Sequence, residues 1–135
     1  MYLLDTNVCI ALINKDPAKA RGHFQQAAKS GQLMYVSSVT SFELWYGVGK
    51  SDREDFNRRR LEIFFSGRVR LLPFDEEDGK SAGFIRSALE AKGKMIGPFD
   101  TLLAGQALRH GLTVATANVR EFSRVEGLKV ENWVR

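Results

Sequence analysis

The chain alternates between short apolar runs and longer segments in which apolar residues recur every three or four positions. The short runs predict strands at residues 2–4, 34–38, 69–72 and 112–116, with an edge strand at 129–131. The longer segments predict helices at 8–13, 18–30, 39–47, 52–65, 75–91 and 101–110, and a short helical turn after residue 118. Because strands and helices alternate, we expect an α/β fold with a mostly parallel sheet of four or five short strands between two helical layers.

The size of the chain indicates one domain. Its 135 residues contain no repeat, low-complexity tract or linker, so residues 1–135 are expected to share a hydrophobic core. A hydrophobic fraction of 44% and a charged fraction of 27% are typical of soluble globular proteins. No apolar run approaches the roughly 18 to 20 residues of a membrane span, and the N-terminus lacks the features of a signal peptide. We therefore expect a cytoplasmic protein without a membrane partner.

The balance of charge is mildly basic. Twenty Lys and Arg residues against sixteen Asp and Glu residues give a net charge of +4, which suits a polyanionic partner without requiring one. Cys9 is the only cysteine, so an internal disulfide is excluded. Its apolar neighbours indicate a buried thiol that acts as a small hydrophobic group.

Oxygen-bearing side chains stand at four corresponding places in this pattern. Asp5 follows the first predicted strand, and Glu43 lies in the first turn of the helix that follows the second strand. Asp100 begins a helix, and Asn118 follows the fourth strand. In a right-handed, doubly wound sheet these points converge on one rim. Clustered carboxylates repel one another unless a cation lies between them, and hard oxygen ligands suit Mg²⁺ or Mn²⁺. The pattern therefore indicates a divalent metal site.

Helix capping is an alternative explanation for each of these side chains. Asp5 and Asp100 are suited to accept the free N–H groups of a first helical turn. Thr40 and Glu43 have the spacing of a capping box, and Asn118 is an ordinary turn residue. Capping does not require the same chemistry at four corresponding corners, but the residues alone leave both explanations open.

Two rival chemistries find little support in the sequence. Gly79-Lys80-Ser81 resembles the end of a phosphate-binding P-loop, but the position of the required earlier glycine is Phe74. A metal-free ribonuclease needs an acid and a base near neutrality. The only histidines, His23 and His110, lie in a helix and beside a helix end, which are poor settings for that role.

Four motifs, in order along the chain, resemble those of PIN-domain ribonucleases, specifically the VapC toxins of bacterial toxin–antitoxin pairs. The motifs are Leu4-Asp5-Thr6-Asn7, the segment 37–44, Ile96-Gly97-Pro98-Phe99-Asp100 and the segment 116–122, and the likeness extends to Trp133. The resemblance implies a three-layer α/β/α PIN fold. It also implies an Mg²⁺-dependent endoribonuclease, with Mn²⁺ as a substitute, that cuts structured RNA such as tRNA and halts translation. The C-terminal tail is similar to members that act on initiator tRNA.

The resemblance also implies roles for individual residues. Asp5 and Asp100 would bind the metal directly, and Glu43 would complete the acidic cluster through the metal or its water. Asn118 stands where many family members carry a further Asp, and the missing charge favours one firmly held ion. Groups expected to orient the carboxylates or the attacking water are Thr6, Asn7, Ser38, Thr101 and Thr116. Basic residues expected to bind flanking phosphates are Arg86, Lys92, Lys94 and Arg120.

The partners implied by the resemblance are a second copy of the chain and a VapB-like antitoxin, which would also supply the contact with promoter DNA. Six aromatic residues are candidates for an antitoxin groove, a dimer contact or ordinary core, namely Phe42, Trp45, Tyr46, Phe56, Phe64 and Phe65.

Two other functions remain as alternatives. The first is a non-catalytic, PIN-like module that binds nucleic acid or regulates a partner. The second is a phosphatase or receiver-like protein with an aspartate nucleophile, which is disfavoured because Asp5-Thr6-Asn7 lacks a second acid two residues after the first.

Overall fold

The computed structural model describes residues 1–135, and its central sheet has five strands. They are β1 (Tyr2–Leu4), β2 (Met34–Ser37), β3 (Val69–Leu72), β4 (Thr113–Thr116) and β5 (Lys129–Asn132). The strand order is β3-β2-β1-β4-β5, and every neighbouring pair is parallel. The predicted α/β fold with a mostly parallel sheet is confirmed, and the first strand of the chain lies at the centre of the sheet.

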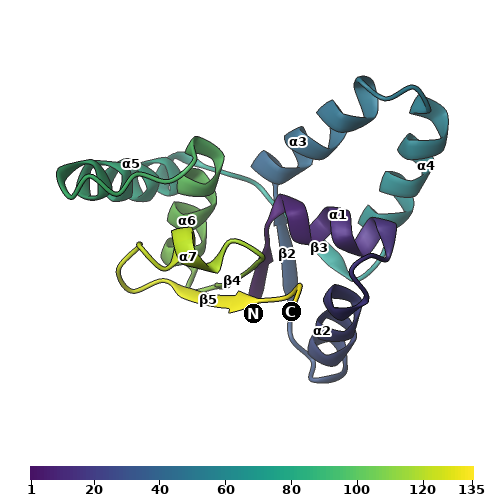
Figure 1. Cartoon of the computed structure of the whole chain (residues 1–135), viewed down its shortest axis with the longest axis horizontal. Helices are drawn as coiled ribbons and strands as arrows, with labels where there is room; N and C mark the ends of the chain where they lie inside the picture. Colours follow the sequence, from purple (N-terminus) through teal and green to yellow (C-terminus); the bar gives the residue numbers. More distant parts are fainter.

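Seven helices accompany the strands (Figure 1). They are α1 (Thr6–Asn14), α2 (Ala18–Lys29), α3 (Ser38–Gly49), α4 (Glu54–Phe65), α5 (Glu76–Ala91), α6 (Pro98–His110) and α7 (Val119–Phe122). Helices α1 to α4 lie on one side of the sheet, and α5 to α7 lie on the other. None of them has both the length and the apolar composition that crossing a membrane requires.

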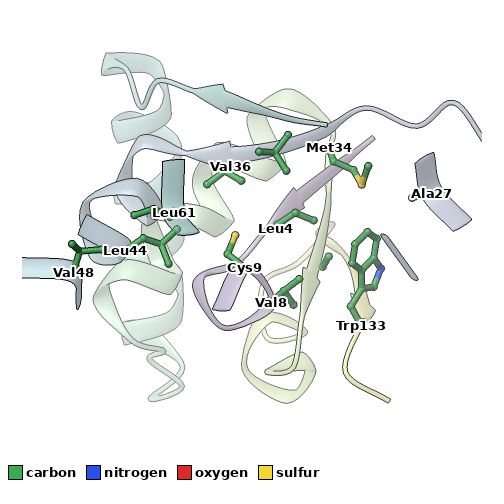
Figure 2. Close-up of a cluster of buried hydrophobic side chains, with 12 residues drawn as sticks. Leu4, Val8, Cys9, Ala27, Met34, Val36, Leu44, Val48, Leu61 and Trp133 are labelled. Atoms are coloured by element: carbon green, nitrogen blue, oxygen red, sulfur yellow. The ribbon is translucent and has the colours of Figure 1, made fainter. Parts of the chain in front are cut away.

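Successive residues of each strand face opposite helical layers. Leu4 belongs to a buried cluster with residues of α1 to α4, shown in Figure 2, whereas Leu3 belongs to a second cluster with residues of α5 and α6. On β4, Ala115 and Val114 divide between the two clusters in the same way. Because strand side chains alternate in direction, the sheet is covered on both faces and the fold has three layers. Cys9 is fully buried in the first cluster, as predicted.

Three helices begin earlier than the sequence predicts, and α3 does so by one residue, at Ser38. Helix α1 starts at Thr6, directly after its cap Asp5. Helix α6 starts at Pro98, ahead of the predicted start at Thr101. A proline is well placed in a first helical turn, because its φ angle is preset and its missing N–H has no partner to lose there. The segment Gly79-Lys80-Ser81 lies inside α5, so it forms no phosphate-binding loop.

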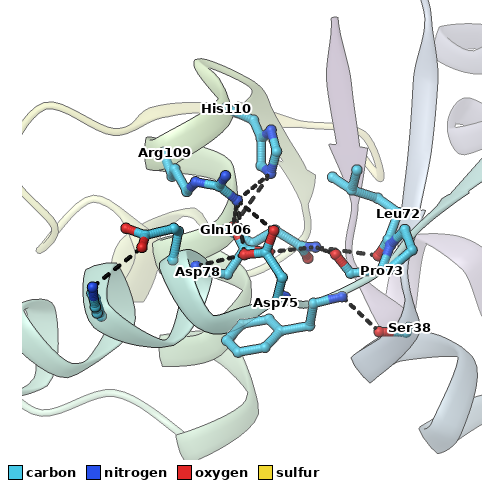
Figure 3. A network of polar contacts seen from close by, with 11 residues as sticks. Ser38, Leu72, Pro73, Asp75, Asp78, Gln106, Arg109 and His110 are labelled. Carbon is cyan, nitrogen blue, oxygen red and sulfur yellow. Dashed lines mark hydrogen bonds and ion pairs between the residues drawn. The ribbon is translucent and has the colours of Figure 1, made fainter.

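A polar network joins the start of α5 to the last turns of α6 (Figure 3). Asp75 and Asp78 form a capping box at the start of α5. Asp78 is fully buried and accepts a hydrogen bond from Arg109 at 2.9 Å. Gln106 donates to Asp78 at 3.4 Å and to two carbonyl oxygens at the end of β3, each at 3.2 Å. The network therefore fixes α6 relative to both α5 and the sheet.

The C-terminal segment completes the first buried cluster. Trp133 is fully buried, and its ring lies 5.0 Å from the ring of Tyr2 and 5.8 Å from that of His23. Its indole N–H donates to Glu131 at 3.0 Å. The two ends of the chain are thus packed together beside α2.

Candidate active site

Asp5 lies where β1 passes into α1, and both of its carboxylate oxygens are engaged. Oδ1 accepts the backbone N–H of Val8 at 2.9 Å, so the predicted capping role is confirmed. Oδ2 accepts a hydrogen bond from the Thr116 hydroxyl at the end of β4. The side chain is 4% exposed. Burial raises the pKa of Asp5 to about 6, and the nearby charges of Asp100 and Glu43 act in the same direction.

Glu43 reaches the same edge of the sheet from the second turn of α3. The Thr6 hydroxyl donates to Glu43 Oε1 at 2.7 Å, and it lies 3.4 Å from the Thr40 hydroxyl. The predicted capping box between Thr40 and Glu43 is wrong, because α3 starts earlier and its cap is Ser37, which accepts from the backbone of Val39 at 3.1 Å. Glu43 is therefore free of capping and faces Thr6.

Asp100 lies in the first turn of α6, two residues after Pro98, and is not the cap of that helix. The cap position is occupied by Gly97. The Asn118 amide donates to Asp100 Oδ2 at 3.2 Å. Burial raises the pKa of Asp100, and the charges of Glu121 and Glu43 raise it further. The capping explanation proposed for Asp100 is therefore wrong.

Asn118 links two carboxylates that lie on different elements. Its amide nitrogen donates to Asp100 and also to Glu121 Oε2, the latter at 2.8 Å. Glu121 was not among the predicted site residues. The signal that identifies it is spacing, since a residue three positions after Asn118 lies on the same side of the short helix α7.

These side chains form one acidic cluster at the carboxyl edge of the parallel strands, consisting of Asp5, Glu43, Asp100 and Glu121. The charges of Asp100 and Glu43 raise the pKa of Asp5, and those of Glu121 and Glu43 raise the pKa of Asp100. None of them forms an ion pair with Lys, Arg or His, whereas the other buried carboxylate, Asp78, is paired with Arg109. Asp5 is buried and the other three are partly buried, and a group of like charges in such a setting is unfavourable without a cationic partner. The cluster therefore lacks a counter-charge within the protein.

The donor chemistry of the cluster fits a hard divalent cation, which prefers carboxylate oxygens. As the side chains stand, no three of them are arranged to hold one metal ion. Each of three is instead held by a neighbour, Asp5 by Thr116, Glu43 by Thr6 and Asp100 by Asn118. The residues available to bind a metal are thus the four members of the acidic cluster.

The hydroxyl and amide groups predicted to orient the site divide into two sets. Thr6 and Thr116 donate to carboxylates of the acidic cluster. Ser38 instead accepts the backbone N–H of Phe74 at 2.9 Å, and Thr101 donates to the carbonyl of Gly97 at 3.0 Å. Asn7 is exposed and its side chain forms no hydrogen bond. In this structure, Ser38 and Thr101 fix the local backbone and do not contact the carboxylates.

The four predicted phosphate-binding residues are exposed and lie in different surroundings. Arg86 pairs with Glu90 at 3.3 Å and lines a cavity between α5 and α6. Lys92 lines a second cavity, beside α5 and the segment after α7. Lys94 precedes α6 and Arg120 lies on α7, and neither forms an ion pair. Only Arg120 is next in sequence to a member of the acidic cluster.

Comparison with known sequences assigns this arrangement to a family. The model of the PIN domain matches residues 2–128. The chain belongs to the PIN-domain family. Within the family, this PIN domain is 42% identical over 132 residues to the tRNA(fMet)-specific endonuclease VapC of Shigella flexneri, covering 98% of this chain and 97% of that protein. It is 38% identical over 133 residues to Ribonuclease VapC2 of Rickettsia felis, covering 98% of each.

A solved structure gives the same assignment. The PIN domain superimposes on a chain in the crystal structure of VapBC2 from Rickettsia felis bound to a DNA fragment from the promoter, with a TM-score of 0.90 and 37% identity over 98% of both chains. The predicted resemblance to VapC ribonucleases and the predicted three-layer fold are both confirmed.

Proposed function

We propose that this PIN domain is the toxin of a VapBC-type pair, an Mg²⁺-dependent endoribonuclease that cuts structured RNA and thereby inhibits translation. The observation that carries the proposal is the acidic cluster at the carboxyl edge of the sheet, which has no cationic partner within the protein. The similarity to proteins named as VapC nucleases supports the same reaction class. The proposed domain comprises residues 1–135 and acts in the cytoplasm.

The residues of the chain divide the work of hydrolysis. Asp5, Glu43 and Asp100 provide fixed negative charge to hold the ion, and Glu121 adds a fourth carboxylate near Asp100. A bound Mg²⁺ or Mn²⁺ supplies the positive charge that polarises a phosphodiester and acidifies a water molecule. Thr6 and Thr116 keep their carboxylate partners oriented, which lowers the cost of reaching the reactive arrangement.

Asn118 contributes no charge, and its amide links Asp100 to Glu121. We propose that Asn118 positions these two carboxylates and that one ion is held firmly.

No side chain of the protein needs to act as nucleophile. Cys9 is fully buried, and its burial and the nearby charge of Asp5 raise the pKa of the thiol. His23 stacks on Trp133, and His110 lies 3.3 Å from Asp78, so neither histidine serves the acidic cluster. Water is therefore the proposed nucleophile.

The proposed substrate is tRNA, and initiator tRNA in particular. One relative is named as a tRNA(fMet)-specific endonuclease. The net charge of +4 and the exposed basic residues Arg86, Lys92, Lys94 and Arg120 favour a polyanion.

The proposed protein partner is a VapB-like antitoxin. A cavity of about 260 Å³ lies between α1, α3 and α4, and its apolar wall includes Ile10, Leu44, Val48 and Leu61. Such a groove suits the apolar face of a partner segment. The structure of VapBC2 from Rickettsia felis bound to promoter DNA supports this pairing. We propose that the antitoxin, and not this chain, contacts promoter DNA. We also propose that the toxin forms a homodimer.

The aromatic residues predicted near these interfaces separate by burial. Phe64 and Phe65 pack against the buried cluster on the α1 to α4 side. Phe42, Trp45, Tyr46 and Phe56 are exposed, and Phe56 lies under the guanidinium of Arg53 at 4.1 Å. Only the exposed group is available to a partner.

The test is cleavage of an initiator tRNA transcript by the purified protein, with Mg²⁺ and with EDTA. We expect Asp100→Asn to reduce cleavage by about 100-fold or more, the scale on which a single electrostatic group contributes in an active site. Asp100 caps no helix, so the fold should be retained. The matched control is Glu62→Gln, which removes an exposed carboxylate on α4.

The outcomes separate the candidate functions. Cleavage that persists undiminished in Asp100→Asn would overturn the assignment of the site. Salt-sensitive binding of the tRNA without turnover under any metal condition would favour the non-catalytic, nucleic-acid-binding alternative.

A further inference from the structure

Two exposed phenylalanine side chains directly precede two members of the acidic cluster. Phe42 precedes Glu43 on α3 and is 60% exposed, and Phe99 precedes Asp100 on α6 and is 41% exposed. Their ring centroids are 6.0 Å apart, with an angle of 51° between the ring planes. The two rings therefore form one apolar surface that spans α3 and α6, hereafter the Phe42–Phe99 pair.

The Phe42–Phe99 pair does not contribute to the core. Neither ring belongs to the buried clusters or to the partly buried residues packed against them. Single exposed apolar side chains are common on protein surfaces, and Phe84, which is 78% exposed, is one of them. Two aromatic rings in contact, each adjoining a candidate metal-binding residue, are a different case, since exposed apolar patches mark binding sites.

Uncharged rings beside an acidic cluster favour a flat, uncharged occupant, and a nucleobase is the part of RNA with these properties. The acidic cluster repels phosphate groups, so without a metal the RNA must be held by groups outside the cluster. The rings are uncharged and can contact the flat face of any base. Phe99 also lines the cavity of about 400 Å³ between α5 and α6, and Arg86 lines the same cavity. A base on the rings would therefore have a cation nearby for the phosphate of an adjoining nucleotide.

We propose that an unpaired nucleobase next to the scissile phosphate stacks on the Phe42–Phe99 pair. The inference rests on the proposed function and identifies the part of the RNA that the site recognises. Stacking on a phenylalanine ring tolerates any base, because every base has a π-face. It requires, however, that the base be free of its helix. The pair thus selects single-stranded nucleotides at the cleavage point by their accessibility and not by their sequence.

The first experiment compares kcat/KM for an initiator tRNA transcript with that for the same RNA carrying abasic nucleotides on either side of the mapped cut. On the intact RNA, Phe99→Ala should lower kcat/KM by about 5- to 150-fold, the range measured for loss of one base–aromatic stack. Phe99→Trp should retain activity, and the control Phe84→Ala should match the wild type. On the abasic RNA, Phe99→Ala should cause no further loss.

A second measurement is independent of cleavage. With EDTA present, a 2-aminopurine placed beside the cut should lose fluorescence on binding to the wild type and retain it on binding to Phe99→Ala. Equal losses for Phe99→Ala on intact and abasic RNA would overturn the stacking proposal. It would also be overturned if Phe99→Ala changed the oligomeric state, because the pair would then be a contact between copies of the chain. Quenching in a protein that cuts no RNA would uphold stacking and reject the proposed nuclease.

Discussion

At the scale of single residues, Asp5 combines two roles that oppose each other energetically. As the cap of α1 it stabilises the helix, because its carboxylate accepts an N–H that has no partner in the first turn. As a buried acid beside Asp100 and Glu43 it destabilises the folded state whenever it is ionised. The proposed cation site would be built from such unfavourable charge.

The substitution Asp5→Asn separates these roles. Burial raises the folded pKa from 3.8 to about 6, so the wild type loses stability as the pH rises from 3.8 through 6. The full loss is on the order of 3 kcal/mol above that range. Asparagine can still cap α1 but carries no charge. In EDTA, urea unfolding should therefore show Asp5→Asn more stable than wild type by about 1 to 3 kcal/mol at pH 8, with the gain vanishing near pH 4.

The control for this prediction is Asp55→Asn, whose carboxylate is exposed on α4 and pairs only with Arg58 at 3.2 Å. It should show no comparable dependence on pH. The measured quantity is the free energy of unfolding of Asp5→Asn minus that of the wild type. A smaller difference at pH 8 than at pH 4 would contradict the roles assigned to Asp5.

The sequence predicted the acidic residues better than it predicted their contacts. Asp5, Glu43 and Asp100 lie close together at one edge of the sheet. Their positions near strand ends and helix starts, which can be read from the sequence, predict this meeting. The sequence does not indicate a role for Glu121, because α7 is a single short helix whose direction depends on tertiary packing. The family resemblance implies that the Thr101 hydroxyl orients the site, but a helical threonine readily bonds the carbonyl four residues earlier, here Gly97.

At the scale of elements, the crossing of α5 and α6 sets where Asp100 lies. The helices meet at Gly105, where an added Cβ would stand 2.5 Å from the backbone nitrogen of Ala82 and 2.6 Å from its Cα. Backbone atoms cannot move aside as the end of a flexible side chain can. Gly105 is thus required for the close approach of the two helices.

We expect Gly105→Ala to destabilise the protein by about 2 to 3 kcal/mol, because the extra methyl group forces the helices apart. The matched control is Gly22→Ala in α2, where nothing lies within 4 Å of the added Cβ. That change should stabilise by about 0.5 to 1 kcal/mol, since alanine favours the helix. Urea unfolding of both variants measures the difference, and a neutral Gly105→Ala would refute the close-contact explanation.

Helix and strand positions followed closely from apolar spacing, and the largest error arose at a helix start, that of α6. Those starts depend on which residue caps the helix, and Ser37 and Gly97 carried no stronger signal than their neighbours. The approach of Gly105 to Ala82 could not be foreseen, since a glycine inside a helical pattern indicates only lower helix propensity. Contacts between helices appear only once the chain is folded.

At the scale of the whole molecule, the last residues belong to the core. The family match ends at residue 128, yet β5 and Trp133 follow it, and Trp133 is fully buried. Strand β5 extends the sheet beside β4, and Trp133 lies against Tyr2 of β1. The C-terminal segment therefore contacts both β4, through the pairing of β5, and β1, through Trp133.

Trp133→Ala should lower the free energy of unfolding by about 3 to 5 kcal/mol, as is usual when a large buried aromatic side chain is removed. Trp45→Ala is the matched control, because Trp45 is 39% exposed on α3. Its loss should cost much less. Thermal or urea unfolding of the two variants tests this, and similar effects from both would show that the C-terminal segment does not share the core.

The parallel sheet was predictable from the alternation of strands and helices, but the order β3-β2-β1-β4-β5 was not. Strand order depends on the direction of each connection between strands and on which face of the sheet each connecting helix covers. Leu3 and Leu4 illustrate the limit, because their apolar run indicates burial on both faces without saying which helices cover each.

The central position of β1 matters during synthesis, when the N-terminus leaves the ribosome first. β1 can pair with β2 early, but its other neighbour, β4, comes near the end of the chain. The hydrogen bond from Thr116 to Asp5 cannot form until Thr116, 111 residues after Asp5, has been synthesised. The hydrogen bond from Asn118 to Glu121 forms later still. A nascent or prematurely terminated chain therefore carries Asp5, Glu43 and even Asp100 without an assembled site. Ribosomes making this protein are thus not exposed to a finished nuclease until nearly the whole chain has emerged.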